Sequence, residues 1–407
     1  MPIEAFSAAS LRRALVIKLR HHGDVLLASP VISTLRRVAP QCEVDALVYA
    51  DTAPMLEGHP ALAQLHLIDR NWKRQGVWHQ AAAEGRLIRQ LRARQYDLVV
   101  HLSVHTRGAW LVRLLRPRWS VAPKFRAGFW ANSFTHLYPA QSHAQRHTVE
   151  TNLDSLRALG MEPAADDKRV IMVPGGEAEA RVAALLAVHG LAPGGFVHVH
   201  PASRWLFKCW PAERVAALCD ALAATGWPLV LTSAPETKEL ALIADIRTAR
   251  AAVTSPRSGI PGTQSQPAPT VDLSGQLSLK ELAALTARAR IFVGVDSAPM
   301  HMAAAMGTPV VAIFGPSGDL EWGPWDPLHK AHRVVASNTH PCRPCGMAGC
   351  NDSKISACLT TLPVAQVLSA CEALLAISPA PCPGQGVRAA TPVQADPALG
   401  RPGGGAA

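Results

Sequence analysis

Residues 293–316 read VGVDSAPMHMAAAMGTPVVAIFGP, a pattern that predicts a strand, a tight turn, a helix and a second strand. Three small residues, Ser297, Ala298 and Pro299, stand where the helix is expected to begin. The first turn of a helix has backbone N–H groups without intrahelical acceptors and carries the positive end of the helix dipole. We therefore expect an anion site at this turn, most simply for a pyrophosphate.

Both halves of the chain repeat the alternation of strand, helix and strand that builds a parallel sheet. In the first half we expect a strand over 14–19, a turn at HHGDVLLAS, a helix over 30–39, and strands over 43–50 and 96–102. In the second half we expect a strand and a turn over 195–203 and a strand over 227–233, with helices over 211–226, 277–290 and 363–377. The pattern predicts two Rossmann-like domains, residues 1–172 and residues 173–378, that face each other across a ligand-binding cleft.

Two segments are expected to be disordered, because their composition cannot build a packed core. Residues 253–270 are rich in Pro, Ser, Gly and Gln, as in a surface insertion. Residues 379–407 form a tail rich in Pro, Gly and Ala. Neither segment is expected to carry chemistry.

The charge balance favours an anionic partner, since 40 Lys and Arg face 30 Asp and Glu for a formal net charge of +10. Aromatic residues are few and are not interleaved with basic runs, so nucleic acid is not expected as a partner. No apolar run reaches the ~18 residues that a spanning helix needs. We expect a cytoplasmic protein whose contact with a membrane is peripheral.

Asp24 follows the first expected strand and therefore stands at the edge of the expected cleft. One interpretation is a helix N-cap, in which the carboxylate accepts a backbone N–H two or three residues further on. The other is a general base for a sugar hydroxyl, with Gly23 allowing a ligand to approach closely.

The loop HPASRWLFKCWP, residues 200–211, places Ser203, Arg204 and Lys208 after the first strand of the second domain. Basic groups and backbone donors at such a position suit a diphosphate, although a solvated loop has the same composition. In the opening stretch His301 lies four residues after Ser297, so a helix places both on one face near Asp296. Such a histidine is either structural or a contact for phosphate or sugar.

Four cysteines follow a C-x2-C-x4-C-x7-C pattern: Cys342, Cys345, Cys350 and Cys358. In a reducing compartment such a cluster suggests a structural metal site, most often zinc, with His340 as an additional ligand. Only the first pair has the spacing of a common zinc motif. Free or oxidised thiols are the alternative.

Taken together and in order, five motifs resemble the lipopolysaccharide heptosyltransferases of glycosyltransferase family 9, in particular the heptosyltransferase III type. They are GDVLLASPVISTLRR, HPASRWLFKCWP, LTSAPE, GQLSLKELAALTARARIFVGVDSAPMHMAAAMGTPVVAIFGP and EWGPW. The resemblance covers about residues 12–377.

The resemblance implies a GT-B fold, with the acceptor bound by the first domain and ADP-L-glycero-D-manno-heptose by the second. It also implies inversion at the anomeric centre and no metal requirement for transfer. Asp24 matches the position of the catalytic base and Lys208 that of the lysine on the donor phosphates. The donor loop is matched by Asp296, Ser297, Ala298 and His301. Ser203 and Arg204 match further positions on the phosphate side. Glu236 matches a ribose contact, and Leu277 matches a residue near the adenine.

Some features depart from the family or do not transfer from it. Ser297-Ala298 stands where some members have Thr-Gly, which keeps a hydroxyl and a small residue. The residues that contact the acceptor cannot be carried over from the family, because no motif marks them. Basic candidates for binding a phosphorylated lipopolysaccharide core are Arg20, Arg107, Lys124 and Arg126. The alternative for each is a solvated surface charge.

Other functions remain open at this stage. A family member could act on another glycan or on a protein, and a nucleotide-sugar epimerase or a non-catalytic nucleotide-sugar sensor would share the two-domain fold. A dehydrogenase is disfavoured, because no G-x-G-x-x-G follows the first strand.

Overall fold

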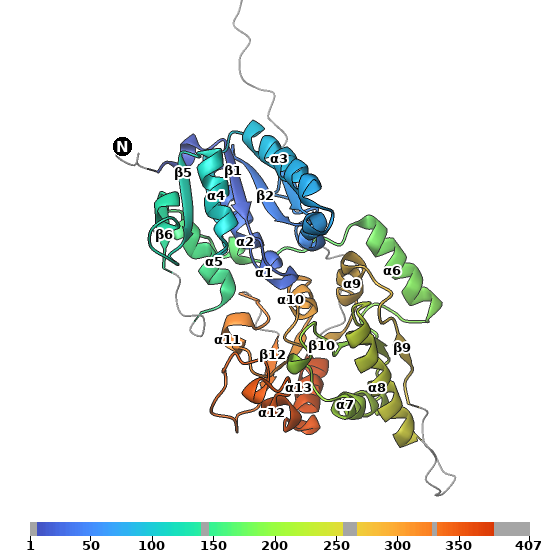
Figure 1. Ribbon diagram of the computed structural model, residues 1–407. Helices are drawn as coiled ribbons and strands as arrows, with labels where there is room; N and C mark the ends of the chain where they lie inside the picture. Colours follow the sequence, from blue (N-terminus) through green and yellow to red (C-terminus); the bar gives the residue numbers. More distant parts are fainter. Residues whose placement is uncertain (1–5, 140–145, 255–266, 328–331, 378–407) are drawn as a thin grey trace, which may run out of the picture.

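The computed structural model describes residues 6–139, 146–254, 267–327 and 332–377, and its chain forms two six-stranded parallel sheets (Figure 1). The strand order is β3-β2-β1-β4-β5-β6 in the first sheet and β12-β11-β10-β7-β8-β9 in the second. Counted from its own first strand, each sheet has the order 3-2-1-4-5-6 of a Rossmann fold. The expected α/β architecture with two Rossmann-like domains is confirmed.

Strands of the first sheet are β1 Arg13–Ile17, β2 Glu43–Tyr49, β3 Gln64–Ile68, β4 Leu98–His101, β5 Trp119–Pro123 and β6 His136–Tyr138. Its helices are α1 His22–Leu26, α2 Ser29–Val38, α3 Val77–Ala93, α4 Thr106–Leu115 and α5 Thr148–Arg157. Successive residues of a strand point to opposite faces, so Ala14 and Val16 join the core that contains α2 and α5, whereas Leu15 and Ile17 join the core that contains α3 and α4. Because both faces are covered, the central strands read as continuous apolar runs.

Strands of the second sheet are β7 Val197–His200, β8 Leu229–Leu231, β9 Thr270–Asp272, β10 Ile291–Val295, β11 Val310–Phe314 and β12 Arg333–Ala336. Its helices are α6 Gly176–Val188, α7 Ala212–Ala224, α8 Thr237–Thr254, α9 Leu279–Thr286, α10 Ala298–Ala305, α11 Asp319–Trp322, α12 Ala357–Thr360 and α13 Val364–Ile377. One face packs against α7, α8 and α13, and the other against α6, α9 and α10. The final helix expected over 363–377 is confirmed.

The two domains touch through side chains and backbone groups near α9, α10 and α11. Leu282, Ala283 and Met302 join the core of the first domain. Lys280 Nζ donates to the carbonyls of Glu57 at 2.7 Å and Val173 at 2.5 Å. These contacts hold the second domain against the first.

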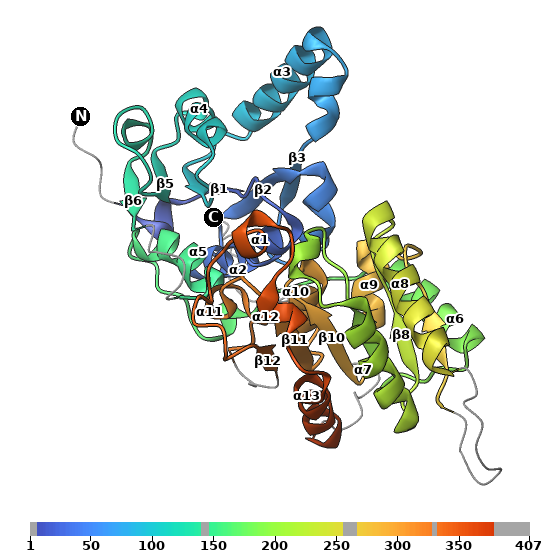
Figure 2. The ribbon, with the colours of Figure 1, turned by 60° about the horizontal axis from the view of Figure 1, so that its bottom comes forward.

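A second contact joins α5 of the first domain to the end of α11, and Figures 1 and 2 both place these helices side by side. The His147 ring stacks on Trp325 with centroids 4.4 Å apart, and His147 Nε2 lies 3.0 Å from the carbonyl of Gly323. The Trp325 indole N–H donates to the carbonyl of Lys168 at 2.7 Å. The indole therefore contacts the first domain through both its ring and its N–H group.

The structure changes several expected bounds. The segment expected as a turn, HHGDVLLAS, contains the helix α1, and the first strand ends at Ile17 rather than at residue 19. The expected insertion is shorter, because α8 continues to Thr254 and β9 begins at Thr270. Residues 255–266 and the expected tail lie outside the described residues. The expected domain boundary at 172 stays a prediction, and it falls between β6 and β7, where the chain changes sheets.

No helix in the described part of the chain combines the length and the apolar character needed to cross a membrane.

Candidate active site

The residues singled out in the sequence follow the central strands of both sheets. In each sheet the chain reverses its direction of progress between two neighbouring strands, β1 and β4 in the first and β7 and β10 in the second. Ligands of open α/β sheets bind at the carboxyl ends of the strands at this reversal. Asp24 follows β1, Lys208 follows β7 and Asp296 follows β10, so all three lie at ligand-binding edges.

Asp24 is the third residue of α1, which contacts α10 of the other domain (Figure 1). The N-cap of α1 is His21, and no side chain caps this helix end, so the N-cap interpretation of Asp24 is wrong. The Asp24 carboxylate lies 3.5 Å from Nε of Arg20, and 12% of its side chain is exposed. Its oxygens are therefore available to a ligand at the domain junction.

The N-terminus of α10 is free of side-chain capping. Ser297 is the N-cap residue with an extended backbone, and its hydroxyl donates to the carbonyl of Val295 at 3.2 Å instead of bonding the first helical turn. Pro299 lies in the first turn and has no N–H to satisfy. This helix end lies at the domain junction, since a Cβ built on Gly23 of α1 would lie 3.9 Å from Cα of Ala298.

Lys208 and Asp296 form an ion pair beside this helix end. Lys208 ends the short 3-10 helix Leu206–Lys208, and its Nζ lies 2.6 Å from Oδ2 of the buried Asp296. The pair links the loop after β7 to the loop after β10. It holds a cation next to the N-terminus of α10, where a diphosphate would need it.

His301 lies at the contact between the two domains. Its side chain is buried, and a Cβ built on Gly23 of α1 would lie 2.9 Å from His301 Cδ2. Burial lowers the pKa of His301 to about 4, although the negative charges of Asp296 and Asp24 act to raise this pKa. Nδ1 of this neutral imidazole is buried and has no hydrogen-bond partner among the described residues, which is unusual for a buried polar atom.

Gly23→Ala tests whether transfer needs the close contact between α1 and α10. The new methyl group would press on the buried His301 ring, so we expect transfer to fall about 10-fold through misplacement of the two domains. The matched control is Gly85→Ala in α3, where an added Cβ meets no atom within 4 Å. Steady-state kinetics and melting temperatures of both variants measure the effect. Equal activity in G23A and G85A would show that the contact is dispensable.

The other donor-side candidates occupy two kinds of position. Ser203 is buried and its Oγ accepts the backbone N–H of Trp205 at 3.3 Å, whereas Arg204 is exposed over the Trp205 ring at 5.5 Å. Burial lowers the pKa of His21, the charge of Asp24 raises it, and the charge of Arg204 lowers it further. Arg204 therefore lies near the first domain. Glu236 is exposed just before α8, and Leu277 is half-buried between the cores of the two domains.

The acceptor candidates lie at the carboxyl edge of the first sheet. Arg20 pairs with Asp24, and Arg107 pairs with Glu84. The pKa of His105 is lowered by burial and then by the charges of Arg107, Lys73 and Arg20. Arg107, Lys73 and Arg20 therefore lie within electrostatic range of His105, and Arg20 also pairs with Asp24. Sequence reasoning missed Lys73 and His105, although both follow strands of the sheet.

Lys124 and Arg126 follow β5 and belong to an exposed aromatic face, which we define as Trp110, Arg113, Lys124, Phe125, Arg126 and Phe129. The rings of Trp110 and Phe129 lie 4.7 Å apart. The Arg113 guanidinium lies 4.8 Å from the Phe129 ring, and that of Arg126 lies 4.8 Å from the Phe125 ring. All three aromatic side chains are exposed, which is unusual for rings of this size.

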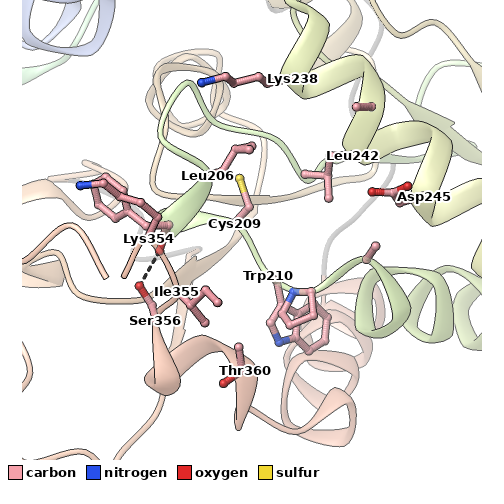
Figure 3. A pocket seen from close by; sticks show the side chains of 14 residues that line it. Leu206, Cys209, Trp210, Lys238, Leu242, Asp245, Lys354, Ile355, Ser356 and Thr360 are labelled. Atoms are coloured by element: carbon pink, nitrogen blue, oxygen red, sulfur yellow. Dashed lines mark hydrogen bonds between the residues drawn. The ribbon is translucent and has the colours of Figure 1, made fainter. Parts of the chain in front are cut away.

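A pocket of the second domain is lined by residues of the Lys208 loop, of α8 and of the segment around α12, and by none of the predicted donor residues (Figure 3). Its walls include Leu206, Trp210, Leu242 and Ile355. At its edge the Ser356 hydroxyl donates to the carbonyl of Phe207 at 2.6 Å. This bond braces the loop that carries Lys208.

The cysteine cluster does not form the expected zinc site in this structure. Cys342, Cys345 and Cys350 are exposed and Cys358 is buried, while Nδ1 of His340 lies 2.7 Å from Ser337 Oγ. Within the ranges that the structure describes, no three His, Cys, Asp or Glu side chains are grouped to hold a metal ion. Structural zinc stays a prediction that the geometry does not support.

A model of the family described as glycosyltransferase family 9 (heptosyltransferase) matches residues 85–355. Over 310 residues the chain is 35% identical to the Escherichia coli protein named lipopolysaccharide heptosyltransferase 3. The aligned region covers 75% of this chain and 84% of the relative.

Two solved structures share the fold. The family 9 glycosyltransferase of Veillonella parvula has a TM-score of 0.72 at 21% identity, covering 90% of this chain and 98% of that chain. An E. coli heptosyltransferase with ADP-2-deoxy-2-fluoro heptose has a TM-score of 0.63 at 20% identity, covering 89% of this chain and 99% of that chain. These likenesses confirm the predicted GT-B fold. With the family match and the 35% identity, they lead to one conclusion: the chain is a transferase that belongs to glycosyltransferase family 9, the heptosyltransferases.

Proposed function

We propose that the protein transfers L-glycero-D-manno-heptose from ADP-heptose to a heptose of the phosphorylated lipopolysaccharide core. The observation that carries this proposal is the contact of α1 with α10, at which the charges of Asp24 from the first domain and of Lys208 and Asp296 from the second all act on His301. The name of the E. coli relative supports the acceptor, and the ADP-sugar analogue in the solved E. coli enzyme supports the donor.

In the proposed mechanism Asp24 accepts the proton of an acceptor hydroxyl as that oxygen attacks the anomeric carbon of the donor. The new glycosidic bond forms as the bond from the anomeric carbon to the phosphate oxygen breaks, and ADP leaves with the electron pair. Attack on the side opposite to the leaving group inverts the anomeric centre.

The second domain stabilises the charge that develops on ADP. Lys208 and the N–H groups of Ser297 and Ala298 lie on the side where the diphosphate is expected, and they are positioned before the reaction begins. We propose that these groups make transfer independent of a metal ion. His301 is neutral at physiological pH and is placed to hydrogen-bond the sugar or the phosphate.

For the acceptor, we propose that Arg20, Lys73 and Arg107 bind phosphates of the core, with His105 as an additional hydrogen-bond donor. Arg20 pairs with Asp24, and phosphate is the anion that arginine and lysine side chains recognise best.

We further propose that the protein works in the cytoplasm, at the inner face of the inner membrane. Its acceptor would be anchored there in the bilayer. The aromatic face joins exposed rings to three basic side chains, a combination that binds the headgroup region of anionic lipid. The face and the acceptor candidates come from neighbouring segments of one sheet edge.

The variant Trp110→Ala/Phe129→Ala is expected to bind vesicles of anionic lipid about 10-fold more weakly, because it removes the two rings in contact on this face. The control is Val188→Ala, which shortens an exposed apolar side chain of the other domain. Sedimentation with vesicles of phosphatidylglycerol, or of phosphatidylcholine alone, measures the binding. Equal binding of both variants to the anionic vesicles would contradict the proposal.

A transfer assay with ADP-heptose and a panel of truncated core acceptors tests the function and names the acceptor sugar. We expect one added heptose on those acceptors that carry the receiving heptose, seen by mass. Conversion of ADP-heptose without any acceptor would indicate an epimerase, and binding of ADP-heptose without turnover would indicate a sensor.

A further inference from the structure

Lys18, at the end of β1, is a buried lysine with no carboxylate in salt-bridge distance among the described residues. Only 5% of its surface is exposed. Its Nζ donates to two neutral acceptors, the carbonyl of Leu102 at 3.0 Å and Oδ1 of Asn152 at 3.1 Å. A lysine is almost never buried in this way unless it has a charged partner or a function.

The nearest explanation for Lys18 in the structure is Asp24, six residues further along the chain. Burial lowers the pKa of Lys18, and among the charges that act on it Asp24 raises the value while Arg20 lowers it. The charges of Lys18 and Asp24 therefore interact. The other groups that face Asp24 are Arg20 and His21 beside it and His301 from α10.

Asn152 connects Lys18 to the helix that carries Asp24. Asn152 is buried in α5, and its Nδ2 donates to the carbonyl of Leu27 at 3.0 Å. Leu27 is the C-cap residue of α1. The chain of bonds from Lys18 through Asn152 to Leu27 thus ties the end of α1 to β1, β4 and α5.

We propose that Lys18 is a positioning residue for Asp24, because its bonds to Leu102 and Asn152 fix the end of α1 against β4 and α5. This inference rests on the proposed role of Asp24 as the general base. A general base works only when its carboxylate is held within hydrogen-bond reach of the proton that it accepts, so the position of α1 decides how well Asp24 can act.

Lys18→Met tests the proposal by removing the charge while keeping most of the side-chain volume. We expect kcat to fall about 10- to 100-fold, with the KM for ADP-heptose changed less than about 2-fold, because Lys18 acts on the acceptor side. Lys18→Gln keeps hydrogen-bond donors for Leu102 and Asn152, so it should retain more of kcat than K18M, and it serves as the test if the methionine variant does not fold.

The matched control is Lys280→Met. Lys280 also donates to two neutral acceptors, the carbonyls of Glu57 and Val173, but it lies at another part of the domain junction. This variant should lose less of kcat than K18M does. A K18M variant with native kcat, or an equal loss of kcat in K280M, would overturn the proposal.

The double variant Asp24→Asn/Lys18→Met separates this inference from the assignment of the base. If Lys18 acts through Asp24, adding K18M to D24N causes little further loss of transfer. A full additional loss would show that Lys18 acts elsewhere. Near-normal transfer by D24N alone would instead refute the base, whatever the Lys18 variants show.

Discussion

Asp24→Asn is expected to reduce heptose transfer by about 10²- to 10⁴-fold, the usual contribution of a general base. The amide keeps the size of the side chain but does not accept the proton of the attacking hydroxyl at neutral pH. Because Asp24 belongs to the acceptor domain, the affinity for ADP-heptose should stay close to that of the native protein. Transfer is measured by product mass, and donor binding by calorimetry.

The matched control for this variant is Asp51→Asn. Asp51 is also a carboxylate of the first domain paired with an arginine, since its Oδ2 lies 3.1 Å from Arg70. It lacks the contact with α10, so transfer should change little. If D24N kept most of the native rate while its melting temperature and donor affinity were unchanged, Asp24 would not be the base.

Lys208→Ala is expected to weaken ADP-heptose binding about 10- to 100-fold, the effect of losing a charge-assisted hydrogen bond to phosphate. The substitution also leaves the buried Asp296 without its cation, so its negative charge would repel the diphosphate. Both effects act on the donor, and the KM for the acceptor should change far less.

Two further variants make the Lys208 result specific. Lys208→Arg keeps the charge and should retain more donor affinity than K208A. Lys238→Ala removes a lysine of α8 that lines the neighbouring pocket (Figure 3) and should leave donor affinity unchanged. A K208A variant that bound ADP-heptose as tightly as K238A would remove Lys208 from its proposed role.

The elements that carry the donor candidates could be predicted well because they lie in short stretches of strong local pattern. The apolar runs of β10 and β11 and the small residues at Ser297 and Ala298 specify a strand, a turn and a helix without help from the rest of the chain. The ion pair of Lys208 with Asp296 joins residues far apart in sequence, and the motifs pointed to both residues without predicting their contact.

The acceptor side was predicted less well because weak elements build it. The strand β3 has polar residues in its sequence QLHLI, and β6 has only three residues, so neither gives a clear periodic signal. Without β3, Lys73 could not be placed near Arg20 and His105. The helix α1 has five residues that include a glycine, and its sequence reads more easily as a turn.

The burial of Lys18 could not be predicted from the sequence. In the sequence Lys18 only interrupts an apolar run, and its neighbours do not distinguish it from a solvated lysine at the end of a strand. Its meaning comes from the tertiary contacts with Leu102 and Asn152, which bury it. Long-range burial of a charge cannot be inferred from one sequence.

The most direct test of the account is a single comparison of the native protein with D24N. Each is incubated with ADP-heptose and a phosphorylated core acceptor that carries the receiving heptose, and both the acceptor mass and the released ADP are measured. The account predicts that the native protein adds one heptose for each ADP released, and that D24N binds the donor but adds almost none. Release of ADP without an added heptose, or equal transfer by both proteins, would contradict it.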